Sequence, residues 1–205
     1  MRSADRHVTA HEPVVTALRA SGRGRVEIEL DGARWRVVPL EAVHRAGLAV
    51  GGTLGRASAR ALRAEMRRQQ ALAAAVGTLR RREHTQSSLD ERLERHGVTP
   101  AERRRTVDTL TRAGLVDDQR YAHARAALLA ERGCGNLLIV DDLERHGVAP
   151  PLAREAIEAL EQEAIRAAAL VARHGLTPAT LRRLAAKGFE ESSLEPLVAE
   201  MGDGA

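Results

Sequence analysis

Arginine is the side chain whose type and spacing most clearly indicate chemistry in this sequence. Four arginines recur every three or four residues in one stretch, a spacing that places them on one face of a helix, and two arginine runs follow. Guanidinium groups bind phosphate and carboxylate in a bidentate manner. The pattern therefore predicts contact with DNA or with an acidic protein surface. The candidate binding residues are Arg56, Arg60, Arg63, Arg67, Arg80, Arg81, Arg82, Arg104 and Arg105.

Positive charge is concentrated in the first part of the chain. The formal net charge is +4 at pH 7, from 32 basic and 28 acidic residues. Residues 131–205 contain 8 basic and 13 acidic residues, which leaves 24 basic and 15 acidic residues in 1–130. A basic front half favours a polyanion or an acidic partner. No aromatic residues are interleaved with the arginines, so we expect any direct DNA binding to be weak, independent of sequence and sensitive to salt.

Acidic and histidine side chains could form a metal or acid–base site, but their positions favour structural roles. Asp117 and Asp118 open a predicted helix, where aspartate caps free N–H groups. Three histidines each stand between an arginine and a glycine that ends a helix, where imidazole can bond free carbonyl groups. These are His96, His146 and His174. Because no phosphate loop, nucleophile elbow or metal motif is present, we expect no catalytic residue, no cofactor and no metal, and therefore no enzyme.

Three related segments predict the architecture that positions the arginines. The hexapeptide Leu93–Val98 recurs 50 residues later at Leu143–Val148, with a proline two residues beyond each copy, and a weaker copy covers Leu184–Phe189. A period of this size is typical of repeat proteins, in which each unit buries its apolar face against its neighbours. We expect a mainly α fold, an elongated array of tandem three-helix repeats preceded by a small antiparallel β meander.

Apolar–polar alternation and turn signals predict the individual elements. Strands are expected near 14–20, 26–30 and 35–38, with Asp31-Gly32 as a hairpin turn. A short helix is expected from Pro39 to Gly47. Longer helices are expected over 58–83, 86–96, 100–113, 118–131, 136–146, 151–174, 178–187 and 190–201. Left-handed glycines are expected at the helix ends Gly97, Gly147, Gly175 and Gly188.

The same signals predict helix caps and a division of the chain. Thr99–Glu102 has the pattern of a full capping box. We expect a β-rich leader with a short helix over 1–55, and helical repeats over 56–114, 115–160 and 161–205. The stretch Met1–Pro13 lacks the apolar core of a signal peptide, and no apolar run approaches the length of a membrane span. We therefore expect a soluble cytoplasmic protein that does not associate with membranes.

Several segments resemble the motifs of the RecX family. Gly114–Ala122 is similar to the family signature Gly-Tyr-Ile-Asp-Asp-x-x-Phe-Ala, and Arg82–Gly97 resembles Arg-x-x-Ser-x-x-Glu-Leu-x-x-x-Leu-x-x-x-Gly. Arg132–Gly147 and Leu184–Phe189 resemble the motifs of the second and third repeats. The predicted meander also resembles the β-rich leader of longer members, so the resemblance covers nearly the whole chain.

The motif residues carried over from the family are expected to be architectural, because they lie at helix starts, helix ends and core positions. Thr85 replaces the usual Ser, which keeps the cap, whereas Ser88 replaces the usual Glu, which removes half of a capping box. The residues that match the family signature are Gly97, Gly114, Asp117, Asp118, Tyr121, Ala122, Gly133, Gly147 and Gly188.

The resemblance implies a regulator of the RecA recombinase. Members of the family bind RecA, lie in the groove of its filament on DNA, block filament extension and suppress ATP hydrolysis and strand exchange. The implied partners are RecA as a monomer and as a DNA-bound filament, in the regulation of DNA repair, recombination and the SOS response. We expect the chain itself to be a monomer. The alternative is a helix-turn-helix-like protein that acts directly on DNA, which a strong preference for one operator sequence would indicate.

Overall fold

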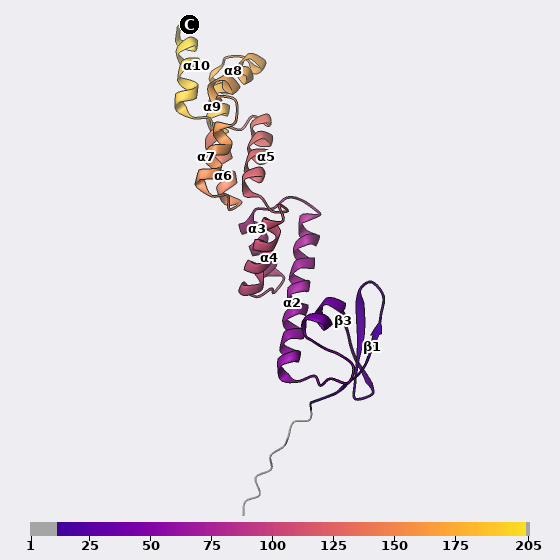
Figure 1. The fold of residues 1–205 in the computed structure, drawn as a ribbon. Helices are drawn as coiled ribbons and strands as arrows, with labels where there is room; N and C mark the ends of the chain where they lie inside the picture. Colours follow the sequence, from indigo (N-terminus) through magenta and orange to yellow (C-terminus); the bar gives the residue numbers. More distant parts are fainter. Residues whose placement is uncertain (1–11, 204–205) are drawn as a thin grey trace, which may run out of the picture. The chain divides into compact units, whose positions relative to one another are not determined.

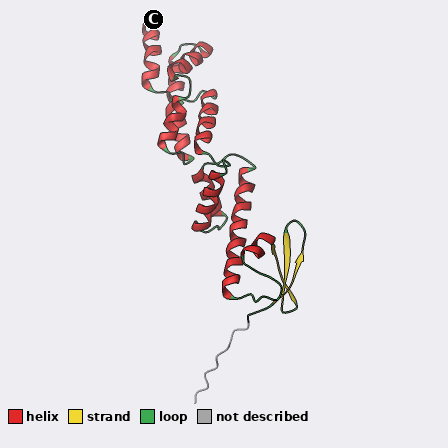
Figure 2. Ribbon diagram, viewed as in Figure 1, coloured by secondary structure: helices red, strands yellow, loops and turns green. Residues whose placement is uncertain are grey.

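The computed structural model describes residues 12–203, which form ten helices and one three-stranded sheet (Figures 1 and 2). Contacts divide the chain into two compact units, one up to Ala73 and one from Ala74 onward, with the boundary inside helix α2 (Arg56–Leu79). The predicted fold class, mainly α with an amino-terminal β meander, is confirmed. The division into four segments stays a prediction. Of the stretch used to predict the absence of a signal peptide, residues 1–11 lie outside the described part.

The first unit begins with an antiparallel sheet whose strands follow the chain order (Figure 1). Its strands are β1 (Val15–Ala20), β2 (Arg25–Leu30) and β3 (Ala33–Pro39). Asp31 and Gly32 join β2 to β3 with φ values of 50° and 81°. Positive φ at both central residues is what a two-residue hairpin of this twist requires, so the predicted hairpin is confirmed.

One face of the sheet packs on helix α1 (Leu40–Arg45) and on the first turns of α2. Ile28 and Val38 are fully buried and share an apolar cluster with Ala42 of α1 and Leu62 of α2. Pro39 ends β3 and is the N-cap of α1, one position before the first helical turn. The first unit thus buries one face of β2 and one face of α2, which leaves the opposite face of that helix segment free.

The second unit contains the end of α2 and eight further helices. These helices are α3 (Gln86–Arg95), α4 (Pro100–Arg112), α5 (Asp118–Glu131), α6 (Asn136–Arg145), α7 (Pro150–Glu158), α8 (Glu163–His174), α9 (Pro178–Ala186) and α10 (Glu191–Asp203). The end of α2, α3 and α4 form the first group, α5–α7 form the second, and α8–α10 form the third. Helices α3, α6 and α9 are the middle members of the three groups. Each group has its own apolar cluster, which contains the repeated leucine Leu93, Leu143 or Leu184.

Neighbouring groups join through end-to-end contacts of their middle helices. The end of α6 lies on the start of α3, here called junction 1, and the end of α9 lies on the start of α6, called junction 2. At junction 1 the Thr85 hydroxyl donates to the His146 carbonyl oxygen (2.5 Å). At junction 2 the Gly135 N–H donates to the Lys187 carbonyl oxygen (2.9 Å). Each contact pairs groups that a helix end would otherwise leave to solvent.

At each junction, an acidic side chain from the first helix of the following group (α5 or α8) caps the start of the middle helix. The Asp118 carboxylate accepts from the N–H of Gln86 (2.8 Å), the first residue of α3. The Glu163 carboxylate accepts from the N–H of Asn136, the first residue of α6. Both carboxylates lie where a helix start favours negative charge. Asp117 caps α5 itself, as predicted, whereas Asp118 caps a helix of the preceding group.

The predicted single helix over 151–174 is wrong. The chain forms α7 and α8 with a break at 159–162, although no Gly or Pro lies in the break. Glu163 is only 6% exposed, and its carboxylate accepts from the backbone N–H of Asn136 and of Glu190. These contacts, 27 positions away on either side, fix the start of α8. Helix propensity is local and cannot register them.

The capping box predicted at Thr99–Glu102 does not form. Thr99 is the N-cap of α4 and Pro100 its first residue, but the Thr99 hydroxyl makes no cap hydrogen bond. Glu102 is buried instead, and one of its carboxylate oxygens has no hydrogen-bond partner within the described chain. Caps do form at Thr85 and Thr177, whose hydroxyls each accept from the N–H three residues onward (3.1 Å).

The predicted helix ends are confirmed, except that Gly175 has an extended ψ of 146° and so is not in the left-handed helical conformation. The four glycines expected there have positive φ, from 73° at Gly97 to 82° at Gly175. His96 and His146 are the C-caps of α3 and α6. The His146 Nδ1–H donates to the Asp142 carbonyl oxygen (2.7 Å), which is one of the free carbonyl groups of the last turn of α6.

Candidate partner-binding surface

The first candidate group is a row of free arginines on the part of α2 that belongs to the first unit. Arg56, Arg60, Arg63 and Arg67 are all exposed, and none forms an ion pair or hydrogen bond with a described residue. Their spacing places them on one face of the helix. Glu65 lies on the buried side and pairs with Arg45 and Arg68. The four guanidinium groups are therefore available to an external anion.

The remaining candidates lie in the second unit, on two separate segments. Arg80, Arg81 and Arg82 follow the end of α2 and are exposed. Arg104 and Arg105 are exposed on α4, where Arg105 lies 3.9 Å from the Glu102 carboxylate.

Their neighbour Arg103 has a different role. It is half-buried and its guanidinium donates to the carboxylates of Asp90 (3.1 Å) and Glu94 (2.9 Å), both on α3. Arg103 thus holds α4 against α3, whereas Arg104 has no such partner among residues 12–203. The run Arg103–Arg105 gives no sign of this difference, because all three residues are identical in sequence.

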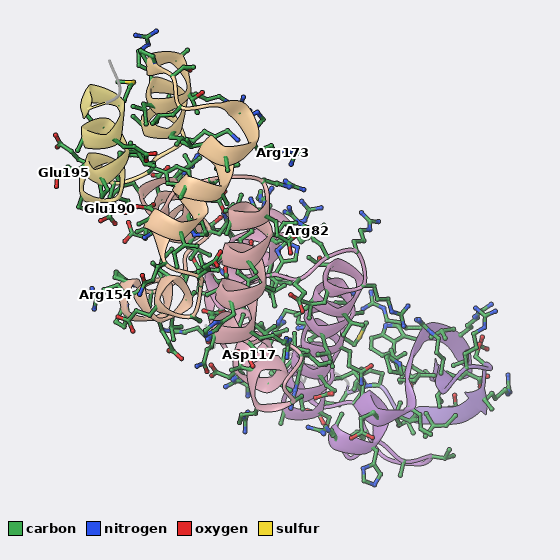
Figure 3. All side chains as sticks on the ribbon, turned by 90° about the horizontal axis from the view of Figure 1, so that it is seen from above. Arg82, Asp117, Arg154, Arg173, Glu190 and Glu195 are labelled. Atoms are coloured by element: carbon green, nitrogen blue, oxygen red, sulfur yellow. The ribbon has the colours of Figure 1, made fainter. Side chains whose placement is uncertain are left out.

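Arg82 is the candidate that the structure brings next to other functional groups. It lines a pocket of about 360 Å³ at junction 1. Figure 3 shows Arg82 projecting on one side of the second unit, away from Arg154, Glu190 and Glu195. The other lining residues are Glu83, His84, Ser88, Tyr121, Ala124, Arg125, Leu128 and His146. Of these, the sequence indicated Tyr121 and His146 only as structural residues, and Arg125 carried no signal.

Ion pairing fixes part of this pocket. The Arg125 guanidinium donates to both carboxylate oxygens of Asp142 (2.7 and 2.9 Å), a bidentate pair. That contact holds the pKa of Asp142 below its usual value and raises the pKa of Arg125. Burial raises the pKa of the Tyr121 hydroxyl, so this group stays protonated at neutral pH and can donate a hydrogen bond. The Tyr121 hydroxyl makes no hydrogen bond to any described residue.

His84 is held neutral by its surroundings. Arg82 Nε donates to His84 Nε2 (3.3 Å), and Ser88 Oγ, which itself donates to the Thr85 carbonyl oxygen, accepts from His84 Nδ1 (3.1 Å). Because both ring nitrogens are used in this way, the network assigns the neutral Nδ1–H tautomer. Burial lowers the pKa of His84 from 6.5, and the nearby guanidinium groups of Arg82, Arg92 and Arg95 lower it further.

Acidification is therefore expected to destabilise the second unit through His84. The pKa of this imidazole is lower in the folded state than its value of 6.5 in the unfolded state. Its contribution to the free energy of unfolding is therefore complete above pH 6.5. That contribution is lost as the pH falls toward the depressed pKa of the folded state. We expect the free energy of unfolding, measured in urea, to begin to fall as the pH drops through 6.5 and to keep falling toward the depressed pKa of the folded state. The variant His84→Gln keeps an acceptor and a donor but does not titrate, and its pH dependence should be shallower. Identical slopes for the two proteins would contradict this assignment.

The signature residues lie in a helical core or where helices begin, end or meet. Ala122 is fully buried in the core of the second group. The carbonyl oxygen of Gly114 accepts from Arg120 (3.2 Å). Gly147 and Gly188 lie in junctions 1 and 2, where an added Cβ would meet Ser87 and Leu138. Within the described chain, no group of three or more His, Cys, Asp or Glu side chains could hold a metal ion, and no helix is long and apolar enough to cross a membrane.

Comparisons with known proteins place this arrangement in context. No family model matches the chain. The regulatory protein RecX of Halorhodospira halophila (strain DSM 244 / SL1) is 30% identical over 146 residues, which cover 60% of this chain and 91% of that protein. A crystal structure of a regulatory protein RecX superposes with a TM-score of 0.75 at 20% identity, covering 91% of this chain and 99% of the other. The crystal structure of RecX from Lactobacillus salivarius gives a TM-score of 0.57 at 16% identity, covering 66% and 97%. At these identities the two crystal structures support the fold.

Proposed function

The chain belongs to the RecX family, and we propose that it regulates the RecA recombinase of its host in the cytoplasm. In this proposal it binds RecA both free and as the filament on DNA, and it lowers ATP hydrolysis and strand exchange. The role is regulatory and does not involve catalysis by the chain itself. The direct consequence would be control of DNA repair and recombination.

Family membership is the observation that carries this proposal. The relative that matches 91% of its own length is named a regulatory protein, and the motifs quoted from the sequence are those of a family that acts on RecA. The geometry is consistent with a binding protein, because the signature residues join helices. The exposed guanidinium groups of Arg56, Arg60, Arg63 and Arg67 have no internal partners within the described chain.

The row Arg56, Arg60, Arg63 and Arg67 supports contact with an anionic surface. A helix rises 1.5 Å per residue, so the row extends over roughly 16 Å. A filament on DNA presents both phosphate groups and acidic side chains, and guanidinium binds either one. We propose that this row contacts the filament. Direct binding to free DNA would then be weak, would show no sequence preference and would fall steeply with salt.

The test is the DNA-dependent ATPase of the host's RecA. We expect the rate of ATP turnover on single-stranded DNA to fall when this protein is added in substoichiometric amounts, because one molecule on a filament can affect many RecA subunits. The same amount of an unrelated basic protein of similar size is the control. An unchanged rate at every ratio would refute the proposed function, and tight binding to one double-stranded sequence would favour a DNA-binding protein instead.

A further inference from the structure

Junctions 1 and 2 are built alike, but the side chains at matching positions make different contacts in the two junctions. Tyr121 and Arg166 occupy matching positions, because each lies three residues after the carboxylate that caps the preceding middle helix. The Arg166 guanidinium crosses junction 2 and donates to the Cys134 carbonyl oxygen (2.9 Å) and to Asn136 Oδ1. One turn later, Leu170 lies against Gly133.

Lys187 closes the other side of junction 2. Its Nζ donates to the Arg132 carbonyl oxygen (2.9 Å). The matching residue at junction 1 is His146, since both are the C-cap of a middle helix. His146 Nδ1 instead donates back to its own helix, to the Asp142 carbonyl oxygen.

Junction 1 has a pocket, and the side chains that match those crossing junction 2 do not cross it. Arg125, at the position of Leu170, turns to Asp142 and does not cross the junction. Tyr121 leaves its hydroxyl without a partner in the described chain. The result is the pocket of about 360 Å³, which is large enough for a side chain of a partner.

The unpaired hydrogen-bond donors of this pocket favour binding of an anion. Arg82 uses only Nε, toward His84, and its terminal nitrogens have no carboxylate partner within the described residues. Arg92 and Arg95 add positive charge near His84. The acidic residue in the lining, Glu83, pairs with Arg120 (3.4 Å). An added carboxylate would thus meet unpaired donors and a positive field.

The walls of the pocket favour a carboxylate on an apolar stem over a phosphate of a nucleic acid chain. Leu128 is 38% exposed and lines the pocket together with Ala124 and Tyr121. These groups can pack on the methylene groups of an acidic side chain. A phosphodiester chain needs a row of cations along its path, and here Glu83 stands at the pocket beside Arg82.

We propose that the pocket at junction 1 binds an acidic side chain of a protein partner, with the carboxylate on Arg82 and the Tyr121 hydroxyl and the stem against Leu128. This inference rests on the proposed function, in which that partner is RecA. It adds a second contact of different chemistry to the open arginine row, because the acidic group would be partly buried. Contacts of that kind favour one partner over other anions.

The experiment measures the affinity of the full chain for the host's RecA without DNA, and separately for a single-stranded oligonucleotide. Arg82→Glu reverses the charge in the pocket. Ala124→Leu fills the pocket without changing charge, and both residues are good helix formers. Arg154→Glu is the matched control, since Arg154 is exposed, is unpaired among the described residues and projects on the other side of the second unit (Figure 3). Thermal melting checks the fold of each variant. If Arg82→Glu proves unstable, the result for Ala124→Leu decides the test.

We expect both pocket variants to bind RecA roughly tenfold to a hundredfold more weakly, the effect of losing a hydrogen bond to a charged group, and Arg154→Glu to change affinity by about twofold or less. Pocket variants that bind RecA like the unchanged protein would overturn this inference alone. A selective loss of oligonucleotide binding would overturn it in favour of phosphate. If the unchanged protein itself fails to bind RecA, both this inference and the proposed function fall.

Discussion

Replacing Gly135 with alanine is expected to lower the free energy of unfolding by on the order of 3 kcal/mol, although Gly135 has an ordinary backbone conformation (φ −83°). An alanine Cβ at this position would overlap the backbone of Gly188 and Phe189 at junction 2. No rotamer change can relieve an overlap between backbone atoms. The start of α6 and the end of α9 would have to separate, which also breaks the hydrogen bond from Gly135 to Lys187.

Gly97→Ala is the matched control. Gly97 has a φ of 73°, and an added Cβ would meet no atom within 4 Å. Its cost is therefore only the strain of a left-handed alanine, about 1 kcal/mol. Both variants are compared by urea denaturation, with amide exchange to show whether α8–α10 open first. Equal losses of stability in the two variants would contradict the structure of junction 2.

The same comparison shows what the sequence could not distinguish among the glycines. The repeat pattern assigns one role, a left-handed helix end, to Gly97 and Gly147 alike. Their φ values agree with that role. An added Cβ at Gly147, however, would overlap the side chain of Ser87. A side chain at Gly147 would therefore lower the free energy of unfolding further, because it meets a neighbouring group of helices. Local turn patterns in the sequence do not reveal that contact.

Most of the fold followed from local signals. Strand alternation, the Asp31-Gly32 turn and the helix-ending glycines have physical causes within a few residues, and the elements they predict are confirmed. The error at 151–174 has a distant cause, the burial of Glu163 under two helix starts. The capping box failed at Glu102 for a similar reason, because that side chain is buried.

The candidate surface followed the same rule. Helical spacing was sufficient to place Arg56 to Arg67 on one exposed face. Ion pairing was not predictable from the sequence, since the difference is that carboxylates of α3 bind Arg103 and do not bind Arg104. The pocket at junction 1 was missed because its lining comes from the loop between α2 and α3, from α3 and α5, and from the end of α6, and the sequence separates these segments by tens of residues.

Reversing the charge of the free arginine row is expected to remove most of the regulatory effect. In the triple variant Arg60→Glu, Arg63→Glu and Arg67→Glu, the amount of protein needed for half-maximal inhibition of the RecA ATPase should rise by about tenfold or more, because each reversal replaces an attraction to the anionic filament with a repulsion. The three residues are exposed and have no partner among the described residues, so the fold should be unaffected.

The control must reverse as many charges at positions that are equally free. Arg166 is unsuitable, because its guanidinium closes junction 2 through Cys134 and Asn136. Arg154, Arg182 and Arg183 are exposed and unpaired within residues 12–203, and their triple reversal gives the same change in net charge. We expect the control variant to inhibit within about threefold of the unchanged protein at physiological salt, where the Debye length is about 8 Å and distant charges are screened. An equal loss in both triple variants would mean that net charge, and not the row on α2, governs binding to the filament.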